Sequence, residues 1–331
     1  YQGDDPVGRH PRGTDTEQRQ TDHGNGGADD DGADQFAHLA HDAGVAQHDF
    51  NHRVRFNSEL EIEHAYSGEG KPGAVELEQA YVEYDWAENH SFKAGLFLVP
   101  VGILNETHEP PTFYGVERNP VEKNIIPTTW WAGGIELTGE IAPGWSYNFG
   151  VHEGLDTDSY NIRSGRQKTS NADAHDLAST ARVKWNGIAG VELAATLQYQ
   201  ENITQGLDND ASAWLYEAHA DVQRGPFGLR ALYARWDIDG DGAKAVGRDE
   251  QDGFYIEPSY KLIPEFGLFA RYSQWDNEAG SNSDSEKKQY NAGFNYWPHP
   301  DVVLKADYQY QDNEGNVDEE KGVNLGIGYQ F

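Results

Sequence analysis

The chain has 331 residues, with 25 Lys and Arg against 56 Asp and Glu, so its formal net charge is -31. This acid excess argues against nucleic-acid partners and against docking on an anionic lipid surface, because phosphates would be repelled. The absence of cysteine excludes disulfides, thiolate metal sites and cysteine nucleophiles.

Residues 1–44 differ in composition from the rest of the chain. They are rich in Gly, Asp, Gln and His and almost lack β-branched residues. We expect a low-complexity acidic leader that is disordered, or a truncated remnant of one or two strands. The chain also has no methionine, so we expect that a signal peptide has been removed or that the sequence is a fragment.

From residue 50 onward the polarity of the side chains alternates with a period of two. Near the C-terminus, Val323, Leu325 and Ile327 alternate with Asn324 and Gly326. Successive side chains of a strand point to opposite faces, so one face is apolar and the other is polar or small. Lipid outside a cylinder and water within it would produce this alternation.

About fourteen segments show this pattern, each of roughly 9 to 13 residues, which is the length of a tilted strand that crosses a bilayer. They cover residues 51–64, 74–85, 91–99, 133–141, 145–153, 176–187, 190–201, 211–223, 226–237, 252–262, 265–275, 287–297, 301–312 and 321–331. Short connections rich in Gly, Pro and Asn alternate with long polar ones. We therefore predict an all-β fold, a closed antiparallel transmembrane β-barrel, over residues 45–331.

Several tryptophans lie near the ends of the predicted strands. Amphipathic rings favour the headgroup level of a membrane, so we expect two aromatic girdles. The tryptophans in question are Trp130, Trp131, Trp145, Trp185, Trp236, Trp275 and Trp297.

Two stretches resemble the phosphate-selective porin O/P family. Gly95–Gly102 is similar to its G-x-F-x-x-P-x-G segment, and the ending Gly-Tyr-Gln-Phe331 resembles the last strand of outer-membrane proteins. Glu117–Pro120 and Gly133–Thr138 fit the same layout. The resemblance implies a 16-stranded barrel in the Gram-negative outer membrane through which small solutes or ions pass. It also implies a homotrimer that contacts outer-membrane lipid and lipopolysaccharide.

The longest insertion between early strands, Ile103–Thr129, is rich in proline. By resemblance it folds into the lumen as a constriction, although it could instead lie outside and cap the barrel or contact a neighbouring subunit. Charges at the narrowest ring of a pore set its selectivity. The charged and titratable candidates of this loop are Glu106, His108, Glu109, Glu117, Arg118, Glu122 and Lys123.

Six basic residues fall on the polar phase of their strands, where a cation avoids the lipid. They are Lys93, Arg182, Lys184, Arg230, Arg271 and Lys305. At the lipid midplane a cation costs about 2–4 kcal/mol, so we expect these side chains to face water. They could form a ladder for anions, or they could pair with glutamates of the same phase: Glu59, Glu61, Glu76, Glu136, Glu192 and Glu217.

The chain carries no pattern typical of a catalytic or metal site. There is no Gly-x-Ser-x-Gly turn and no phosphate-binding P-loop, so we expect no enzyme and no cofactor. Asp237–Gly242 resembles the start of a calcium loop, but Arg248 stands where the last ligand is needed.

We therefore predict a porin for passive diffusion of small hydrophilic solutes and ions. The first alternative is an anion- or phosphate-selective channel of the same fold. The second is a soluble carbohydrate-binding β-protein.

Overall fold

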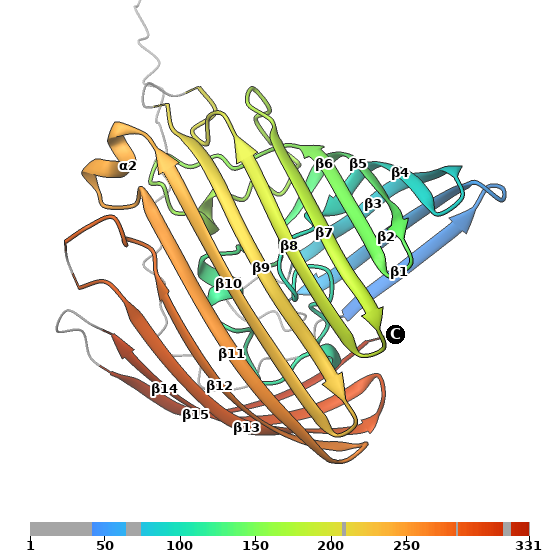
Figure 1. The fold of residues 1–331 in the computed structure, drawn as a ribbon, viewed down its shortest axis with the longest axis vertical. Helices are drawn as coiled ribbons and strands as arrows, with labels where there is room; N and C mark the ends of the chain where they lie inside the picture. The colour runs from blue at the N-terminus through green and yellow to red at the C-terminus, as the bar shows by residue number, and fades with distance from the viewer. Residues whose placement is uncertain (1–41, 64–73, 207–209, 283, 314–318, 331) are drawn as a thin grey trace, which may run out of the picture. The chain divides into compact units, whose positions relative to one another are not determined.

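The computed structural model describes residues 42–63, 74–206, 210–282, 284–313 and 319–330. Fifteen strands form one sheet, and each strand pairs antiparallel with its neighbours along the chain (Figure 1). The strands are β1 (Asp42–Asp49), β2 (Val54–Glu63), β3 (Ala74–Ala87), β4 (His90–Leu98), β5 (Trp131–Ala142), β6 (Trp145–His152), β7 (Ala178–Ile188), β8 (Val191–Gln200), β9 (Ser212–Arg224), β10 (Phe227–Asp239), β11 (Glu250–Ile263), β12 (Phe266–Asp276), β13 (Lys287–His299), β14 (Val302–Asn313) and β15 (Glu320–Tyr329).

Helical turns occur only in connections of the described chain. They are η1 (Pro110–Thr112), α1 (Val121–Asn124), η2 (Arg163–Gly165) and α2 (Asp241–Ala245). No helix in this part of the chain has the length and apolar composition needed to cross a membrane.

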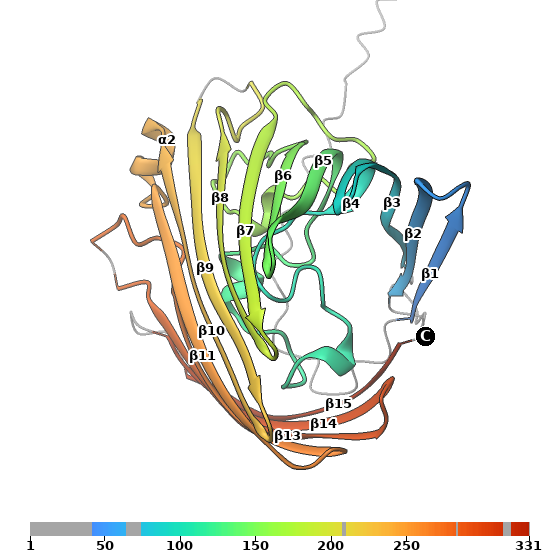
Figure 2. The same cartoon turned by 45° about the vertical axis from the view of Figure 1, so that its right-hand side comes forward.

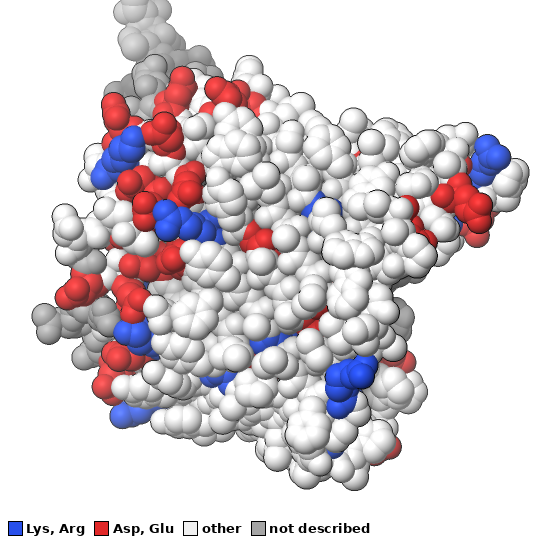
Figure 3. Space-filling view, in the orientation of Figure 1, with Lys and Arg blue, Asp and Glu red and all other residues white. Residues whose placement is uncertain are grey.

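The period-two pattern separates the two faces of the sheet. On β8, Leu193 and Leu197 are exposed on the convex face, whereas Gln198 is buried on the concave face. Leu197 pairs with Tyr216 of β9, which is also exposed, so the apolar band continues from strand to strand. Figure 3 shows this face as mostly uncharged over the middle of the strands, with acidic side chains gathered along the edge of the long connections.

The fourteen predicted strand segments are confirmed as β2–β15, with small differences at their ends. Strand β1 was not predicted, because Val45 is the one large aliphatic residue in its sequence. It begins at Asp42, so the sheet starts three residues before the boundary predicted at residue 45. The rest of the predicted leader, residues 1–41, lies outside the described residues.

The connections alternate in length as the sequence indicates. Short turns join β5 to β6, β7 to β8, β9 to β10, β11 to β12 and β13 to β14 at one end of the sheet (Figure 1). At the β7–β8 turn, Gly190 has φ +73°, and a Cβ there would lie 2.1 Å from the Gln223 carbonyl oxygen. Longer connections occupy the opposite end; in outer-membrane barrels that end is extracellular.

The sheet is strongly curled, and its edges are β1 and β15 (Figures 1 and 2). Within the described residues, β1 pairs only with β2 and β15 only with β14. The segment between β4 and β5, residues 99–130, lies on the concave side, and we call it the inner loop (Figure 2).

The predicted aromatic girdle is wrong for several tryptophans. Trp130, Trp236 and Trp275 are buried because they belong to the apolar core that the inner loop forms with the wall. Trp131, the first residue of β5, is also buried, and the Lys168 ammonium lies 5.0 Å from its ring centre. Trp297 also contacts the inner loop, since its indole nitrogen donates to the Pro111 carbonyl oxygen at 3.1 Å. Trp145, by contrast, is exposed beside the β5–β6 turn, with its ring 6.3 Å from that of Trp185.

Candidate channel-lining site

The inner loop is held against the wall by an apolar core. Val121, Ile125 and Ile126 are fully buried and belong to the same cluster as Leu215 of β9 and Trp236 of β10. The indole nitrogen of Trp236 donates to the Ile125 carbonyl oxygen at 2.9 Å. Apolar burial and a directed hydrogen bond therefore fix this part of the loop on the concave face.

Glu122 organises the interior of the loop. One of its carboxylate oxygens accepts the backbone N–H groups of Ile103 and Leu104, each at 2.7 Å. The other accepts the Asn119 amide and the Tyr255 hydroxyl, each at 2.9 Å. Glu122 is fully buried, so it is a structural acceptor for four donors and does not present its charge to a passing solute.

Glu106 is a loop residue whose carboxylate pairs with a cation of the wall. It forms an ion pair with Arg182 of β7, and about a third of its side chain (32%) is exposed. Burial acts to raise the pKa of the Glu106 carboxyl, but the charge and hydrogen bond of Arg182 outweigh it and hold that pKa below its usual value. Arg182 also donates to Asn148 Oδ1, at 2.9 Å from Nη2, so its guanidinium is fully engaged between loop and wall.

Three wall cations hold carbonyl oxygens of the inner loop. Arg230 donates to the Thr112 oxygen at 3.1 Å, Lys305 to the Phe113 oxygen at 3.0 Å, and Arg271 to the Glu117 oxygen at 3.4 Å. The Lys305 ammonium also lies 3.5 Å from the centre of the Phe113 ring. These cations, which the sequence placed on the lumen side, thus serve to position residues 112–117 of the loop.

Five of the six predicted lumen cations form ion pairs with carboxylates. Besides Arg182 with Glu106, the nitrogen–oxygen distances are 3.7 Å for Lys93 with Glu136, 3.2 Å for Lys184 with Glu192, 3.0 Å for Arg230 with Asp221 and 3.3 Å for Arg271 with Glu257. Arg182, Arg271 and Lys305 are buried, whereas Lys93, Lys184 and Arg230 are partly exposed. Pairing with carboxylates therefore describes most of this set better than an open ladder of positive charge. Only two of the five partners, Glu136 and Glu192, are among the glutamates expected from the sequence.

The remaining predicted loop residues take different positions. His108 is buried against Glu78 of β3. Glu109, Glu117 and Arg118 are partly exposed, and Lys123 is exposed. The loop therefore exposes charges of both signs while it buries others as supports.

A second loop, residues 153–177 between β6 and β7, packs on the inner loop and was not predicted to do so. Arg163 donates to the Lys123 carbonyl oxygen at 2.9 Å, and Arg166 donates to the Thr129 carbonyl oxygen at 2.6 Å. Leu155 and Ile162 of this loop are fully buried in the shared apolar core. These two aliphatic residues stand in an otherwise polar stretch, and they were the feature of the sequence that could have indicated a buried loop.

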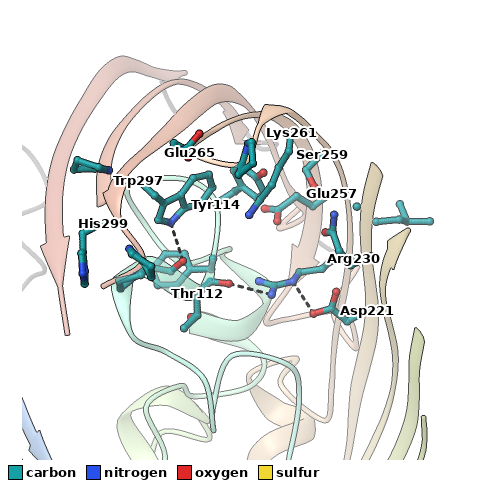
Figure 4. A pocket seen from close by; sticks show the side chains of 18 residues that line it. Thr112, Tyr114, Asp221, Arg230, Glu257, Ser259, Lys261, Glu265, Trp297 and His299 are labelled. Atoms are coloured by element: carbon teal, nitrogen blue, oxygen red, sulfur yellow. Dashed lines mark hydrogen bonds and ion pairs between the residues drawn. The ribbon is translucent and has the colours of Figure 1, made fainter. Parts of the chain in front are cut away.

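Two cavities lie beside the inner loop toward the short-turn end. One, of about 500 Å³, is lined by Tyr114, Glu257, Lys261 and Trp297 among others (Figure 4). The other, of about 630 Å³, is lined by Glu106, Lys184 and Glu192 among others. Both include Thr112, Asp221, Gln223 and Arg230, so the two cavities adjoin at the Arg230–Asp221 ion pair.

The profile of Gram-negative porins matches residues 15–316. The chain belongs to the Gram-negative porin family. The porin is 30% identical over 311 residues to an uncharacterized protein of Aquifex aeolicus strain VF5, a match that covers 81% of the porin and 69% of that protein.

Solved porins share the fold at low sequence identity. OmpF of Salmonella typhi, solved with daunomycin, matches with a TM-score of 0.61 and 16% identity, over 86% of this chain and 88% of OmpF. An anion-selective porin of Comamonas acidovorans has a TM-score of 0.59 and 15% identity, over 87% and 83% of the two chains. The DcaP channel of Acinetobacter baumannii has a TM-score of 0.59 and 16% identity, over 86% and 82%.

The family and the fold together identify an outer-membrane β-barrel channel. They confirm the predicted porin, its location in the Gram-negative outer membrane and its role in transport. A porin is a channel rather than an enzyme, and the alternative of a soluble sugar-binding protein is wrong.

Proposed function

We propose that this porin is a general diffusion channel in which the inner loop narrows a water-filled lumen. The observation that carries the proposal is the placement of the loop: it lies on the concave face, bound to β7, β10, β11, β13 and β14 by side-chain hydrogen bonds and ion pairs. Solutes would pass between the loop and the wall beside the cavities that Arg230 and Asp221 share.

The charges of this passage favour weak ion selectivity. Lys184 and Arg230 are partly exposed in the cavities, but each lies about 3 Å from a carboxylate, that of Glu192 or Asp221. Paired charges of opposite sign produce little net potential for a mobile ion at the distance of a few ångströms. We therefore propose diffusion of small hydrophilic solutes and ions of both signs.

The alternative is an anion-selective or phosphate-selective channel, the finer activity implied by the porin O/P resemblance. It is favoured by the three cations that line the cavities, Lys184, Arg230 and Lys261. The Lys261 ammonium lies 4.7 Å from the centre of the Trp297 ring. Among the ion pairs of the described residues, none joins Lys261 to a carboxylate.

Reversal potentials in planar bilayers separate the two proposals. Under a KCl gradient, and again with potassium phosphate, we expect a small potential in the wild type. Replacing Lys184 and Arg230 together by Gln should shift it toward potassium by a few-fold in permeability ratio, because the two positive charges that offset Glu192 and Asp221 are then removed. A strong preference of the wild type for chloride or phosphate would refute general diffusion and support the alternative.

We also propose that the porin assembles as a homotrimer. OmpT of Vibrio cholerae, which was solved in a trimer form, shares the fold with a TM-score of 0.54 and 12% identity. Chemical crosslinking in outer membranes tests this proposal: a ladder that stops at three copies supports it, and a monomer alone contradicts it.

A further inference from the structure

We propose that Glu59, Glu78 and His108 form a binding site for a divalent transition-metal ion that links the inner loop to the wall. One ligand atom from each residue lies within 4.8 Å of the other two, and all three side chains are buried. Glu59 belongs to β2, Glu78 to β3 and His108 to the inner loop. The site does not depend on the proposed selectivity of the channel.

A β-bulge aims Glu78 at this position. Glu59 pairs with Gln79 and Leu60 pairs with Leu77, so Glu78 is the extra residue that the register omits. Leu77 before the bulge and Val82 after it are both exposed on the convex face, which shows that the alternation changes phase between them. Bulges of this kind re-aim a side chain and often occur beside functional sites.

The two carboxylates of the cluster lack sufficient positive charge. Among the described residues, no Lys or Arg forms an ion pair with Glu59 or Glu78. Glu78 Oε1 has no hydrogen-bond partner, and Oε2 lies 2.8 Å from His108 Nε2. Glu78 is fully buried, and two buried carboxylates in close proximity repel each other unless a cation neutralises them. A protonated His108 would supply one positive charge, whereas a divalent ion supplies the two charges that two carboxylates require.

The surroundings of His108 fit a metal ligand. Its Nδ1 lies 3.2 Å from the Asn105 carbonyl oxygen, which can accept the Nδ1 proton. The other nitrogen, Nε2, lies 2.8 Å from Glu78 Oε2 and donates a proton to it when no ion is bound; a metal ion would take the place of that proton. Metal-binding histidines characteristically donate their second nitrogen to a carbonyl or carboxylate, and this contact fixes the tautomer and the ring.

A second polar contact orients Glu59. The Gln79 amide donates to Glu59 Oε2 at 2.6 Å, so this carboxylate is held from the neighbouring strand. One imidazole and two carboxylates suit ions such as Zn²⁺ better than Mg²⁺ or Ca²⁺, which prefer oxygen ligands alone. With bonds of about 2.1 Å, a tetrahedral ion needs its ligand atoms about 3.4 Å apart. The distance of 2.8 Å between His108 Nε2 and Glu78 Oε2 would have to widen by about 0.6 Å, and the other distances, which are at most 4.8 Å, would have to shorten by no more than about 1.4 Å.

The test is zinc binding to the full-length porin, extracted from outer membranes in detergent, stripped with a chelator and dialysed. Affinity is measured by competition with a chromophoric chelator in the wild type, Glu78→Gln and His108→Gln. His175→Asn is the matched control, because this histidine is exposed on the loop between β6 and β7. We expect one tight zinc ion per chain in the wild type and in the control, and at least a tenfold loss of affinity in both cluster variants.

Two outcomes would overturn the proposal: equal zinc affinity in the wild type and Glu78→Gln, or loss of the tight ion in His175→Asn. If circular dichroism shows that a cluster variant does not fold, the readouts are Glu59→Gln and anomalous X-ray scattering at the zinc edge from wild-type crystals soaked in ZnCl₂. A peak between the three side chains supports the site. The absence of a peak there after soaking at a saturating zinc concentration refutes it.

Discussion

Removing the Glu122 carboxylate should release the inner loop from the wall. Glu122→Ala leaves four donors without an acceptor: the N–H groups of Ile103 and Leu104, the Asn119 amide and the Tyr255 hydroxyl. At about 1 kcal/mol for each buried donor, local opening of the loop becomes easier by about 4 kcal/mol. Since each 1.4 kcal/mol is a factor of ten, the open population rises roughly 1000-fold.

Limited trypsin digestion of the detergent-extracted porin measures this opening, because Arg118 and Lys123 lie in the inner loop. When opening is fast relative to cleavage, the cleavage rate follows the open population. Glu122→Gln keeps one acceptor oxygen, so we expect about half the free-energy change and cleavage roughly 30-fold faster than in the wild type. The control is Glu109→Ala, a partly exposed residue of the same loop, which should be cleaved at the wild-type rate. Wild-type protection in Glu122→Ala would refute the reasoning.

Three further substitutions test the wall and its contacts. Gly95→Ala should destabilise the barrel by about 3 kcal/mol or more in urea unfolding, because φ is +136° and a Cβ would lie 2.3 Å from the Ala80 oxygen. Gly150→Ala, where a Cβ meets its nearest atoms at 3.7 Å, is the tolerated control. Leu197→Lys, on the convex face, should cost about 2–4 kcal/mol of folding into lipid vesicles but little in detergent if that face meets lipid. Trp236→Phe should speed tryptic cleavage of the inner loop about tenfold, since the Ile125 oxygen loses its donor; unchanged cleavage would contradict this role.

The strands could be predicted because their signal is local. A strand between lipid and water repeats every two residues, and Leu193 and Leu197 of β8 show the repeat without reference to any other strand. Strand β1 lacks that signal, since its residues are mostly small or polar. The bulge at Glu78 was also missed, because the pattern on either side of it is regular and only the phase changes.

The candidate site depends on contacts between distant segments, and these limited its prediction. The phase of β10 and β14 placed Arg230 and Lys305 on the lumen side, but it carries no information about the loop carbonyls that they hold. Glu122 resembles a surface charge in the sequence, since its four donors come from three separate segments. Charge on a face can be predicted from periodicity, whereas the partner of that charge requires the fold.

The odd number of strands in the described part of the chain affects how the wall can be sealed. With every neighbouring pair antiparallel, β1 and β15 run in the same direction. If these two edges met, their seam would be parallel, with the slanted hydrogen bonds of parallel pairs. Lipid offers no water to unpaired backbone groups, so the wall needs either that parallel seam or one additional antiparallel strand to be complete in the membrane.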